Sequence, residues 1–259
     1  MPAFLRACLI VCPLVFLAGF VDSVAGGGGT ISIPAFLLAG VPTRMALGTN
    51  KLTACCGTAL SAWNYRKQGK VLLRVALVSA AGSLIGSYGG TRLALLIPEQ
   101  ALKTVLLVAL PCVALFLCFN KGFGDEAKLR NLTARQEMGL SFVIGLVIGC
   151  YDGLIGPGTG TFLILAFSGI LGIDLLTSSG CAKMSNLASN LASAVVYAAA
   201  GSVWYALAIP ALLFNMAGNY CGTKYALRGG SKNVRKVMFL VLALLFVKVI
   251  LELCGVEFG

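Results

Sequence analysis

The sequence predicts an all-α protein that crosses a membrane several times and consists of two homologous halves. Three observations predict this class. The 259 residues are 58% hydrophobic and only 11% charged, whereas soluble domains carry about 25% charged residues. Several apolar stretches are long enough to span a bilayer, and the chain contains a similar Gly-rich interruption twice. The net charge of +11 comes from Lys and Arg in short loops, which favours membrane orientation by positive loops over binding of nucleic acid.

The first half is expected over residues 1–119. Residues 7–21 carry no charge and, with their flanks, predict one spanning helix. After the first interruption, residues 31–41 are too short to span as a regular helix, so we expect a discontinuous segment. Further helices are expected over residues 45–65, 71–96 and 101–119. The segment over residues 71–96 contains Gly82, Gly86 and Gly90, spaced one turn apart, which allows another helix to approach closely.

A polar linker over residues 120–137, expected in the cytoplasm, leads to a second half over residues 138–259. This half repeats the first at a constant offset from residue 48 onward, and upstream residues align after a two-residue insertion. The matched pairs include Gly48 with Gly180, Lys51 with Lys183, Tyr65 with Tyr197, Gly90 with Gly222, Asp22 with Asp152 and Gly26 with Gly156. The sequence therefore predicts an internal duplication.

The charges of the loops predict how the two halves are oriented. The loop over residues 66–74 contains four basic residues, and the equivalent loop around residue 201 contains none. The loop over residues 228–236 contains four, and its equivalent over residues 92–103 contains two and an acid. If positive loops are cytoplasmic, the halves are inverted, with five membrane segments each and both termini outside. If the broken segment is only re-entrant, four crossings per half give parallel repeats and leave the charge exchange unexplained.

The two interruptions, at residues 22–34 and 152–161, predict a substrate site. Each combines an acid, glycines and a proline, and such a break frees backbone groups that hydrocarbon cannot satisfy. Paired breaks in corresponding halves are typical of transporter binding sites, where backbone donors and helix N-termini attract anions. Close helix packing is the alternative reading. The candidate binding residues here are Gly26, Gly27, Gly28, Thr30, Gly156, Gly158 and Thr159.

Two lysines at equivalent repeat positions are candidate anion ligands. Lys51 and Lys183 are lone charges in apolar segments, and a charge in a membrane segment is a functional hypothesis by default. Snorkelling to the interface is the alternative. Asn50, Asn186 and Asn190 add amide groups nearby. Since positions 183, 186 and 190 share one helical face, this combination suits a small oxyanion.

Asp22 and Asp152 directly precede the two breaks. We consider them candidates for proton coupling, or for pairing with the buried lysines. Capping of the broken helix ends is the alternative. Neither break matches a phosphate-binding P-loop or a dinucleotide-binding motif.

These stretches resemble the TauE/SafE sulfite-exporter family of membrane transporters, also called TSUP. The resemblance rests on residues 18–29 with Pro34, residues 48–52, Tyr151-Asp152-Gly153, Gly156-Pro157, and Ala182-Lys183 with Asn186 and Asn190. It covers nearly the whole chain and is nearest to the bacterial inner-membrane branch. It implies a multi-pass protein of the bacterial plasma membrane that transports small anions, often sulfite or organosulfonates.

The leading functional prediction is a secondary transporter, in the exporting direction, that binds a small anion at the membrane midplane and works by alternating access. A gated anion channel is the first alternative. A membrane-embedded enzyme is the second, and the absence of His and of a recognisable nucleophile–base pair argues against it. We expect no cofactor, no metal and no nucleic acid. The expected partners are the anion and the lipid bilayer, and a homo-oligomer stays open.

Overall fold

The computed structural model describes residues 3–102, 104 and 132–253, and every regular element in these residues is an α-helix. The all-helical class predicted from the sequence is confirmed for this part of the chain. The expected span over residues 101–119 lies almost entirely outside the described residues, and so does most of the expected linker over residues 120–137.

The first half contains four of the described helices, and they correspond to the segments expected before residue 100. They are α1 (Ala3–Ala25), α2 (Gly29–Leu38), α3 (Thr43–Lys67) and α4 (Leu73–Leu96). The discontinuous segment is thus a helix of 10 residues, too short to cross the hydrocarbon at 1.5 Å per residue. Phe36 near its end packs with Ala7 and Val11 of α1 and with Ala46 of α3. α2 therefore leads back toward the end of the molecule at which α1 begins.

The second half repeats this order. Its described helices are α6 (Ala134–Leu154), α7 (Thr159–Leu171), α8 (Leu175–Ala199) and α9 (Tyr205–Leu253). α6 begins with a capping box, in which the backbone N–H of Gln136 donates to Thr133 Oγ1 and that of Thr133 donates to Gln136 Oε1. α9 is kinked at Gly230, whose φ of 60° and ψ of −154° are not helical, so it comprises two helices.

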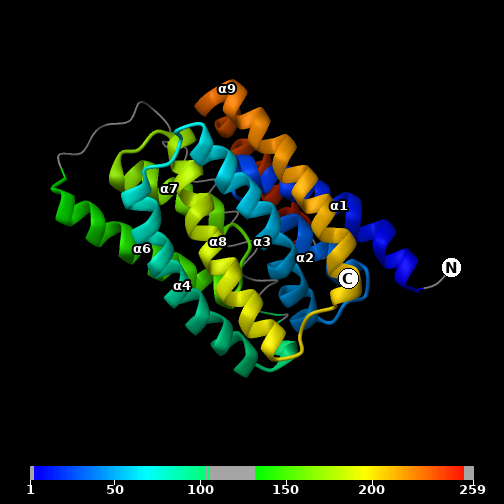
Figure 1. Ribbon diagram of the computed structural model, residues 1–259. Coiled ribbons are helices and arrows are strands. Elements are labelled where there is room, and N and C mark those ends of the chain that lie inside the picture. The colour runs from blue at the N-terminus through cyan, green and yellow to red at the C-terminus, as the bar shows by residue number, and fades with distance from the viewer. Residues whose placement is uncertain (1–2, 103, 105–131, 254–259) are drawn as a thin grey trace.

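The two halves are interleaved, because the most extensive helix contacts join one half to the other: α1 with α9, and α4 with α6 (Figure 1). The glycines singled out in the sequence make these contacts. Gly82, Gly86 and Gly90 of α4 lie directly against the α6 backbone, at Phe142, Leu146 and Cys150 respectively. A Cβ at any of the three would overlap that backbone, so only glycine permits this approach.

These contacts also fix the relative direction of the helices. Residue numbers rise together along α4 and α6, so the two helices run parallel. The same holds for α1 and α9, where Gly218 lies against Phe16 and Gly222 against Phe20. α3 and α4, and likewise α8 and α9, are joined by short turns and run in opposite directions (Figure 1).

Two buried polar seams hold further inter-half contacts. Between α3 and α9, Ser61 Oγ donates to Asn219 Oδ1 at 2.8 Å and lies 2.9 Å from Thr223 Oγ1. At the equivalent place between α8 and α4, Ser193 Oγ lies 2.7 Å from Ser87 Oγ and 2.8 Å from Thr91 Oγ1. Inter-helix hydrogen bonds of this kind join helices in lipid, where the apolar side chains supply no hydrophobic driving force.

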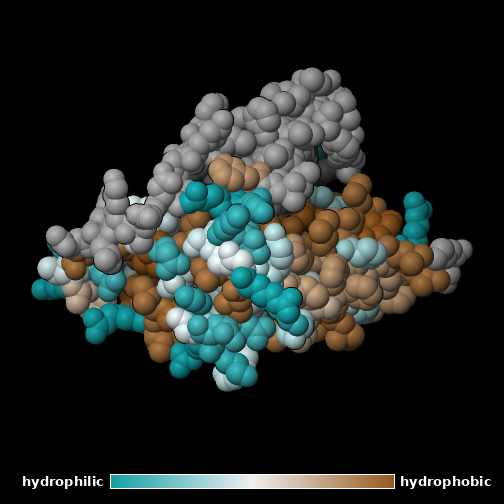
Figure 2. Space-filling model, turned by 90° about the horizontal axis from the view of Figure 1, so that it is seen from above, coloured by the Kyte–Doolittle hydropathy of each residue, from teal (hydrophilic) through white to brown (hydrophobic). Residues whose placement is uncertain are grey.

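The outside of the helix bundle suits a bilayer. Large apolar side chains such as Leu84, Val147 and Leu213 are about half exposed or more. Figure 2 views the end at which α3 ends and α4 begins, and shows hydrophilic residues gathered in the middle with apolar residues on the flanks. Among the described helices, α1 and α6 are long and apolar enough to span a membrane by composition alone. The other long helices contain more polar residues.

Candidate functional site at the two helix breaks

Each break uses glycine where the backbone turns with positive φ. Gly26 follows α1 with φ of +80°, and Gly156 and Gly158 follow α6 with φ of +95° and +81°. These are left-handed conformations that side chains disfavour. The glycines therefore end one helix and start the next within four residues or fewer.

The two breaks meet in the middle of the molecule. The backbone of Gly26 lies against that of Gly160, and a Cβ on either residue would overlap the other. Thr161 Oγ1 donates to the carbonyl oxygen of Ala25 at 2.7 Å. The sequence predicted both breaks, and the structure joins them into one region to which both halves contribute.

Two buried ion pairs connect the halves at this region. Lys51 Nζ of α3 lies 2.7 Å from Asp152 Oδ2 of α6, and Lys183 Nζ of α8 lies 2.8 Å from Asp22 Oδ2 of α1. Each lysine thus pairs with the aspartate of the other half. Burial of a charge in a membrane segment is costly unless a partner compensates it, so the pairing explains how both lysines are tolerated.

The two pairs differ in how firmly the carboxylate is held. Asp152 is 3% exposed, and it accepts hydrogen bonds from Thr159 Oγ1 at 2.7 Å and from Ser189 Oγ as well as pairing with Lys51. The side chain of Asp22 is 14% exposed, and Lys183 is its one side-chain partner given by the described contacts. Lys183 also donates to the backbone carbonyl of Asp22 at 2.5 Å. Asp22 is the more accessible of the two carboxylates.

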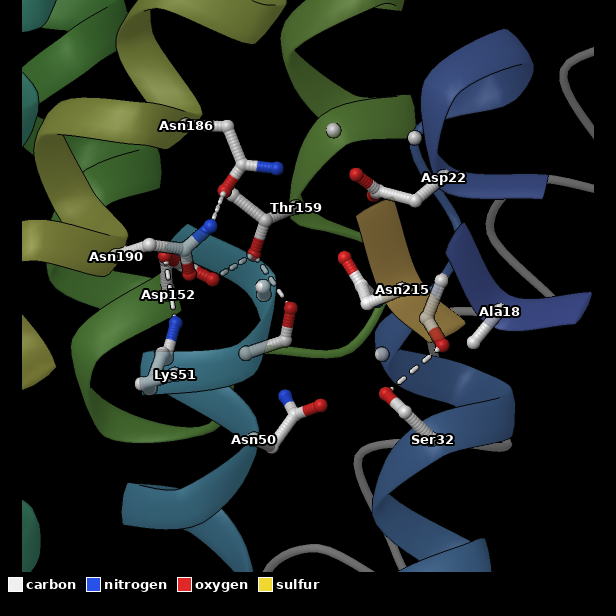
Figure 3. Close-up of a pocket in the computed structure, with 16 residues that line it drawn as sticks. Ala18, Asp22, Ser32, Asn50, Lys51, Asp152, Thr159, Asn186, Asn190 and Asn215 are labelled. Carbon is white, nitrogen blue, oxygen red and sulfur yellow. Dashed lines mark hydrogen bonds and ion pairs between the residues drawn. The ribbon is translucent and has the colours of Figure 1, made fainter. Parts of the chain in front are cut away.

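A small cavity lies between the ion pairs (Figure 3). It offers about 30 Å³ to the centres of water molecules, where one water needs roughly 10–15 Å³. The residues that line it are Ala18, Asp22, Gly26, Gly28, Gly29, Ser32, Asn50, Lys51, Ala54, Asp152, Gly156, Thr159, Gly160, Asn186, Asn190 and Asn215. In this conformation the cavity has room for a few water molecules or a very small ion.

Four asparagines supply neutral donors and acceptors to this cavity. Asn50 comes from α3, Asn186 and Asn190 from α8, and Asn215 from α9. Asn190 Nδ2 donates to Asn186 Oδ1 at 3.1 Å, and their side chains face the cavity together with Thr159 (Figure 3). The N-termini of α2 and α7 also reach the cavity, through Gly29 and Thr159. Helix N-termini carry partial positive charge and free N–H groups that suit an anion.

Most of the residues singled out in the sequence lie at this cavity. Gly26, Gly28, Asn50, Lys51, Gly156, Thr159, Asn186, Asn190, Asp22 and Asp152 line it. Lys183 does not, and it is fully buried behind Asp22. Gly27, Thr30 and Gly158 do not line it either. Thr30 Oγ1 donates to the carbonyl of Gly27 at 2.6 Å, and Gly158 precedes α7 in a left-handed conformation, so these residues shape the breaks.

Ser32, Asn215 and Ser189 were missed by the sequence reasoning. Asn215 had a readable signal, because it forms with Asn219 and Thr223 a polar row, four residues apart, in an otherwise apolar helix. Ser189 had no such signal in the sequence, because its role depends on a contact with Asp152 of another helix. In the described residues, no group of three or more His, Cys, Asp or Glu could hold a metal. The arrangement offers ionic and hydrogen-bonding contacts to a small polar ligand.

Comparison with known proteins finds membrane transporters that are similar over nearly the full length of the chain. A family model described as "Sulfite exporter TauE/SafE" matches residues 11–249. The chain is 34% identical to a probable membrane transporter protein, ORF9, of Sinorhizobium, over 92% of this chain and 90% of that protein. It is 31% identical to the probable membrane transporter protein YfcA of Escherichia coli, over 94% and 90%.

A probable membrane transporter protein of Haemophilus influenzae is 30% identical, over 92% of each chain. No solved structure matches. These names point to transporters rather than enzymes. Together with the helical bundle, its apolar flanks and the polar cavity at two broken segments, they show that this chain belongs to the TauE/SafE family of membrane transporters.

Proposed function

We propose that the protein is a secondary transporter of small anions, such as sulfite or organosulfonates, in the exporting direction across a bacterial inner membrane. The observation that carries this proposal is the pair of exchanged Lys–Asp contacts on either side of one polar cavity. The family name and the relatives' names support transport as the activity. The choice of sulfite rests on the family description, and the amide groups and helix N-termini at the cavity support a small anion.

The cavity suits an anion only if a lysine is released from its aspartate. Both lysines are already paired, so the four charges cancel and the cavity has no excess positive charge. An entering oxyanion must compete with a carboxylate for Lys51 or Lys183, or arrive together with a proton that neutralises one. The asparagine amides and the N-termini of α2 and α7 supply the remaining donors.

We propose Asp22 as the principal proton-coupling residue, with Asp152 as the second candidate. Asp22 is more exposed and has fewer partners, whereas Asp152 is held by three side chains. A proton on Asp22 removes its attraction for Lys183 and leaves that lysine able to attract the anion. Coupled binding carries the proton and the anion in the same direction, so export by this route follows the concentration gradient of the anion and is not driven by the inward proton gradient.

We also propose that the two halves are inverted repeats. The parallel runs of α1 with α9 and of α4 with α6 support this. α3 and α8 run in opposite directions, because Gly48 near the start of α3 lies against Ser202 after α8, and Gly180 near the start of α8 lies against Lys70 after α3. Since α4 turns back from α3 and α9 from α8, α4 and α9 are also opposed, and so are α1 and its counterpart α6. α2 leads back to the end at which α1 starts, so α1 and α2 make no net crossing. Since α4 and α6 run parallel, the end of α4 and the start of α6 lie at opposite ends of the molecule. The odd crossing that inversion needs is the span predicted over residues 101–119, most of which lies outside the described residues.

The end that contains Arg66, Lys67 and Arg74, and on α9 Arg228 and Lys232, is proposed to be cytoplasmic. In this arrangement residues 1–119 and 138–259 are the two repeats, joined by a cytoplasmic linker over residues 120–137. Reporter fusions at residues 128 and 232 should report the cytoplasm, and one at residue 201 the outside. If fusions at residues 69 and 201 report the same side, the halves are not inverted.

The test of the function is a thermal-shift screen of the purified protein with sulfite, sulfate, sulfonates and carboxylates, followed by counterflow in vesicles. A ligand at 100 times its Kd raises the stability by about 2.7 kcal/mol. Lys183→Met and Lys51→Met should each remove this thermal shift. Replacement of either lysine by arginine should weaken the shift, because the planar guanidinium group binds an anion with a different geometry from an amine. A Lys183→Met protein with unchanged anion affinity would contradict the proposed site.

Saturable uptake with counterflow is expected for a transporter. The small volume of the central cavity supports this over a continuous pore. Single-channel currents in a planar bilayer would instead identify a gated anion channel.

A further inference from the structure

A second cavity lies at the end of the bundle where α3 ends, between α3 and α9. It offers about 340 Å³ to the centres of water molecules, far more than the central cavity. The residues that line it are Asn64, Lys67, Gln68, Tyr220, Thr223, Lys224, Leu227 and Arg228. Neither the ion pairs nor the helix breaks contribute to it, so it is a separate site.

This cavity is strongly basic. Lys67, Lys224 and Arg228 all contribute to it, and no acidic residue is among its lining residues. The two salt bridges found in the described residues lie elsewhere, at the helix breaks. The Nζ of Lys224 lies 5.9 Å from the ring centre of Tyr220, a contact that keeps an amine near the aromatic face. Asn64 and Gln68 add neutral donors.

The surroundings of the cavity are those of a membrane interface. Trp63, one turn before Lys67, is 65% exposed, and Tyr220 is 50% exposed. Exposed Trp and Tyr beside basic residues are typical of the layer in which lipid headgroups lie. Leu227 adds an apolar contact at the rim. A ligand here can place a charged group among the cations and an apolar part along the outer surface of α3 and α9.

The internal duplication provides a natural comparison. The positions equivalent to Tyr220, Thr223 and Lys224 are Tyr88, Thr91 and Arg92, so the aromatic residue and one cation are present on both sides. The positions equivalent to Lys67, Arg228 and Asn64 are Ala199, Leu96 and Val196. Two cations and an amide are thus added at one end of the molecule alone, beyond what the repeat itself supplies.

We propose that this cavity binds the headgroup of an anionic phospholipid of the cytoplasmic leaflet, such as phosphatidylglycerol. The phosphodiester oxygens would lie among Lys67, Lys224 and Arg228, where arginine can bind two oxygens at once. The acyl chains would follow Trp63 and Leu227. Basic pockets between helices on the cytoplasmic side are suited to such headgroups. The bound lipid bridges α3 and α9, and this role is independent of the transported anion.

The test uses delipidated full-length protein in a neutral detergent, with binding measured by native mass spectrometry and by thermal shift. The probes are phosphatidylglycerol, phosphatidylethanolamine and inorganic phosphate. We expect phosphatidylglycerol to bind and to raise the Tm, with little effect of the other two. The variant Lys67→Ala/Arg228→Leu copies the residues of the other repeat. It should lower the affinity about 30-fold, since each cation near an anionic surface contributes roughly fivefold.

A matched control removes the same charge from the same end. Lys70→Ala/Arg74→Leu changes two exposed basic residues outside the cavity and should retain phosphatidylglycerol like the unaltered protein. Equal losses in the two variants would mean general surface charge and would overturn the proposal. A Tm shift with inorganic phosphate that matches the shift with the lipid, and depends on Lys67 and Arg228, would also overturn it, because the site would then take a soluble anion.

Discussion

The two ion pairs occupy equivalent places in the repeat and differ in their surroundings. Asp152 has Lys51, Thr159 and Ser189 as partners, whereas Asp22 has Lys183 and is several times more exposed. The difference follows from two substitutions, since the positions equivalent to Thr159 and Ser189 are Gly29 and Gly57. Loss of two hydroxyl groups leaves one carboxylate freer than the other. This contrast indicates that the Lys51–Asp152 pair contributes more to stability, and that the Lys183–Asp22 pair is the one that separates more easily.

The largest expected effect is on stability. Asp152→Asn leaves Lys51 buried without its counterion, and loss of one partner of a buried ion pair costs about 3–5 kcal/mol. Asp22→Asn should cost less, because Lys183 keeps the backbone carbonyl of residue 22 as an acceptor. Thermal unfolding in detergent measures both. Asp174→Asn is the control, since Asp174 is an exposed N-cap of α8 and asparagine caps equally well. A larger loss for Asp22→Asn would reverse the assignment of roles.

A second experiment separates stability from binding at the firmly held pair. Lys51→Met combined with Asp152→Leu removes both charges, and apolar replacement of a buried ion pair is often neutral or stabilising. We expect the double variant to recover most of the stability that Asp152→Asn loses, with a coupling energy of about 0.5–3 kcal/mol in the mutant cycle. Anion binding should stay absent. Additive losses in the cycle would mean that the two side chains do not stabilise each other.

The third experiment addresses the freer pair. If Asp22 takes up the coupled proton, transport by Asp22→Asn should lose its dependence on external pH, while a residual downhill flux remains. Rates measured in vesicles between pH 5 and 8 test this. Glu99→Gln serves as the control, because Glu99 accepts a hydrogen bond from the backbone of Thr43 away from the cavity. A steep pH dependence that persists without the Asp22 carboxyl group would assign coupling to another residue.

The smallest effect concerns the polar seams. Asn219 accepts from Ser61 and donates to both oxygens of Asn215, whereas Ser87 bonds to the carbonyl of Ser189 and to the hydroxyl of Ser193. Polar contacts between membrane helices average about 0.6 kcal/mol each. Asn219→Ala should therefore cost about 1–2 kcal/mol and Ser87→Ala about 1 kcal/mol in thermal unfolding. Equal costs would indicate that the two seams contribute alike.

The comparison of the two ion pairs also shows how much of the structure could be predicted from the sequence. Helix bounds and break positions follow from local hydropathy and from glycine and proline. Lys51 and Lys183 are recognisable as lone charges in apolar segments. The exchange of partners is not predictable, since it depends on which helices pack together. The glycines at 82, 86 and 90 predicted a close helix contact, and the partner α6 lies in the other half.

The residues at the central cavity show a second limit of prediction from the sequence. Asn50, Asn186 and Asn190 were predicted from their spacing near the lysines, and they line it. Ser32 was not, because a serine in a short apolar helix is equally compatible with a hydrogen bond to its own backbone, which it also makes with Gly28. Lys183 was predicted to be an anion ligand, and in the structure it lies behind Asp22 and does not line the cavity. The spacing of residues predicts which face of a helix a side chain lies on. How deeply that face is buried depends on tertiary contacts, which the spacing does not give.

The exchange of partners has a consequence for how the chain is made. Lys183 follows Asp22 by 161 residues, and synthesis at about 5–20 residues per second separates their appearance by roughly 10–30 s. During that interval α1 contains an acid whose counterion is not yet synthesised, and until α6 is made the glycines of α4 also lack their packing partner. The first half therefore has to wait in the insertion machinery or in the bilayer, exposing its polar surface, until the second half arrives. Membrane insertion is therefore the stage at which we expect this protein to expose the most polar surface without a partner.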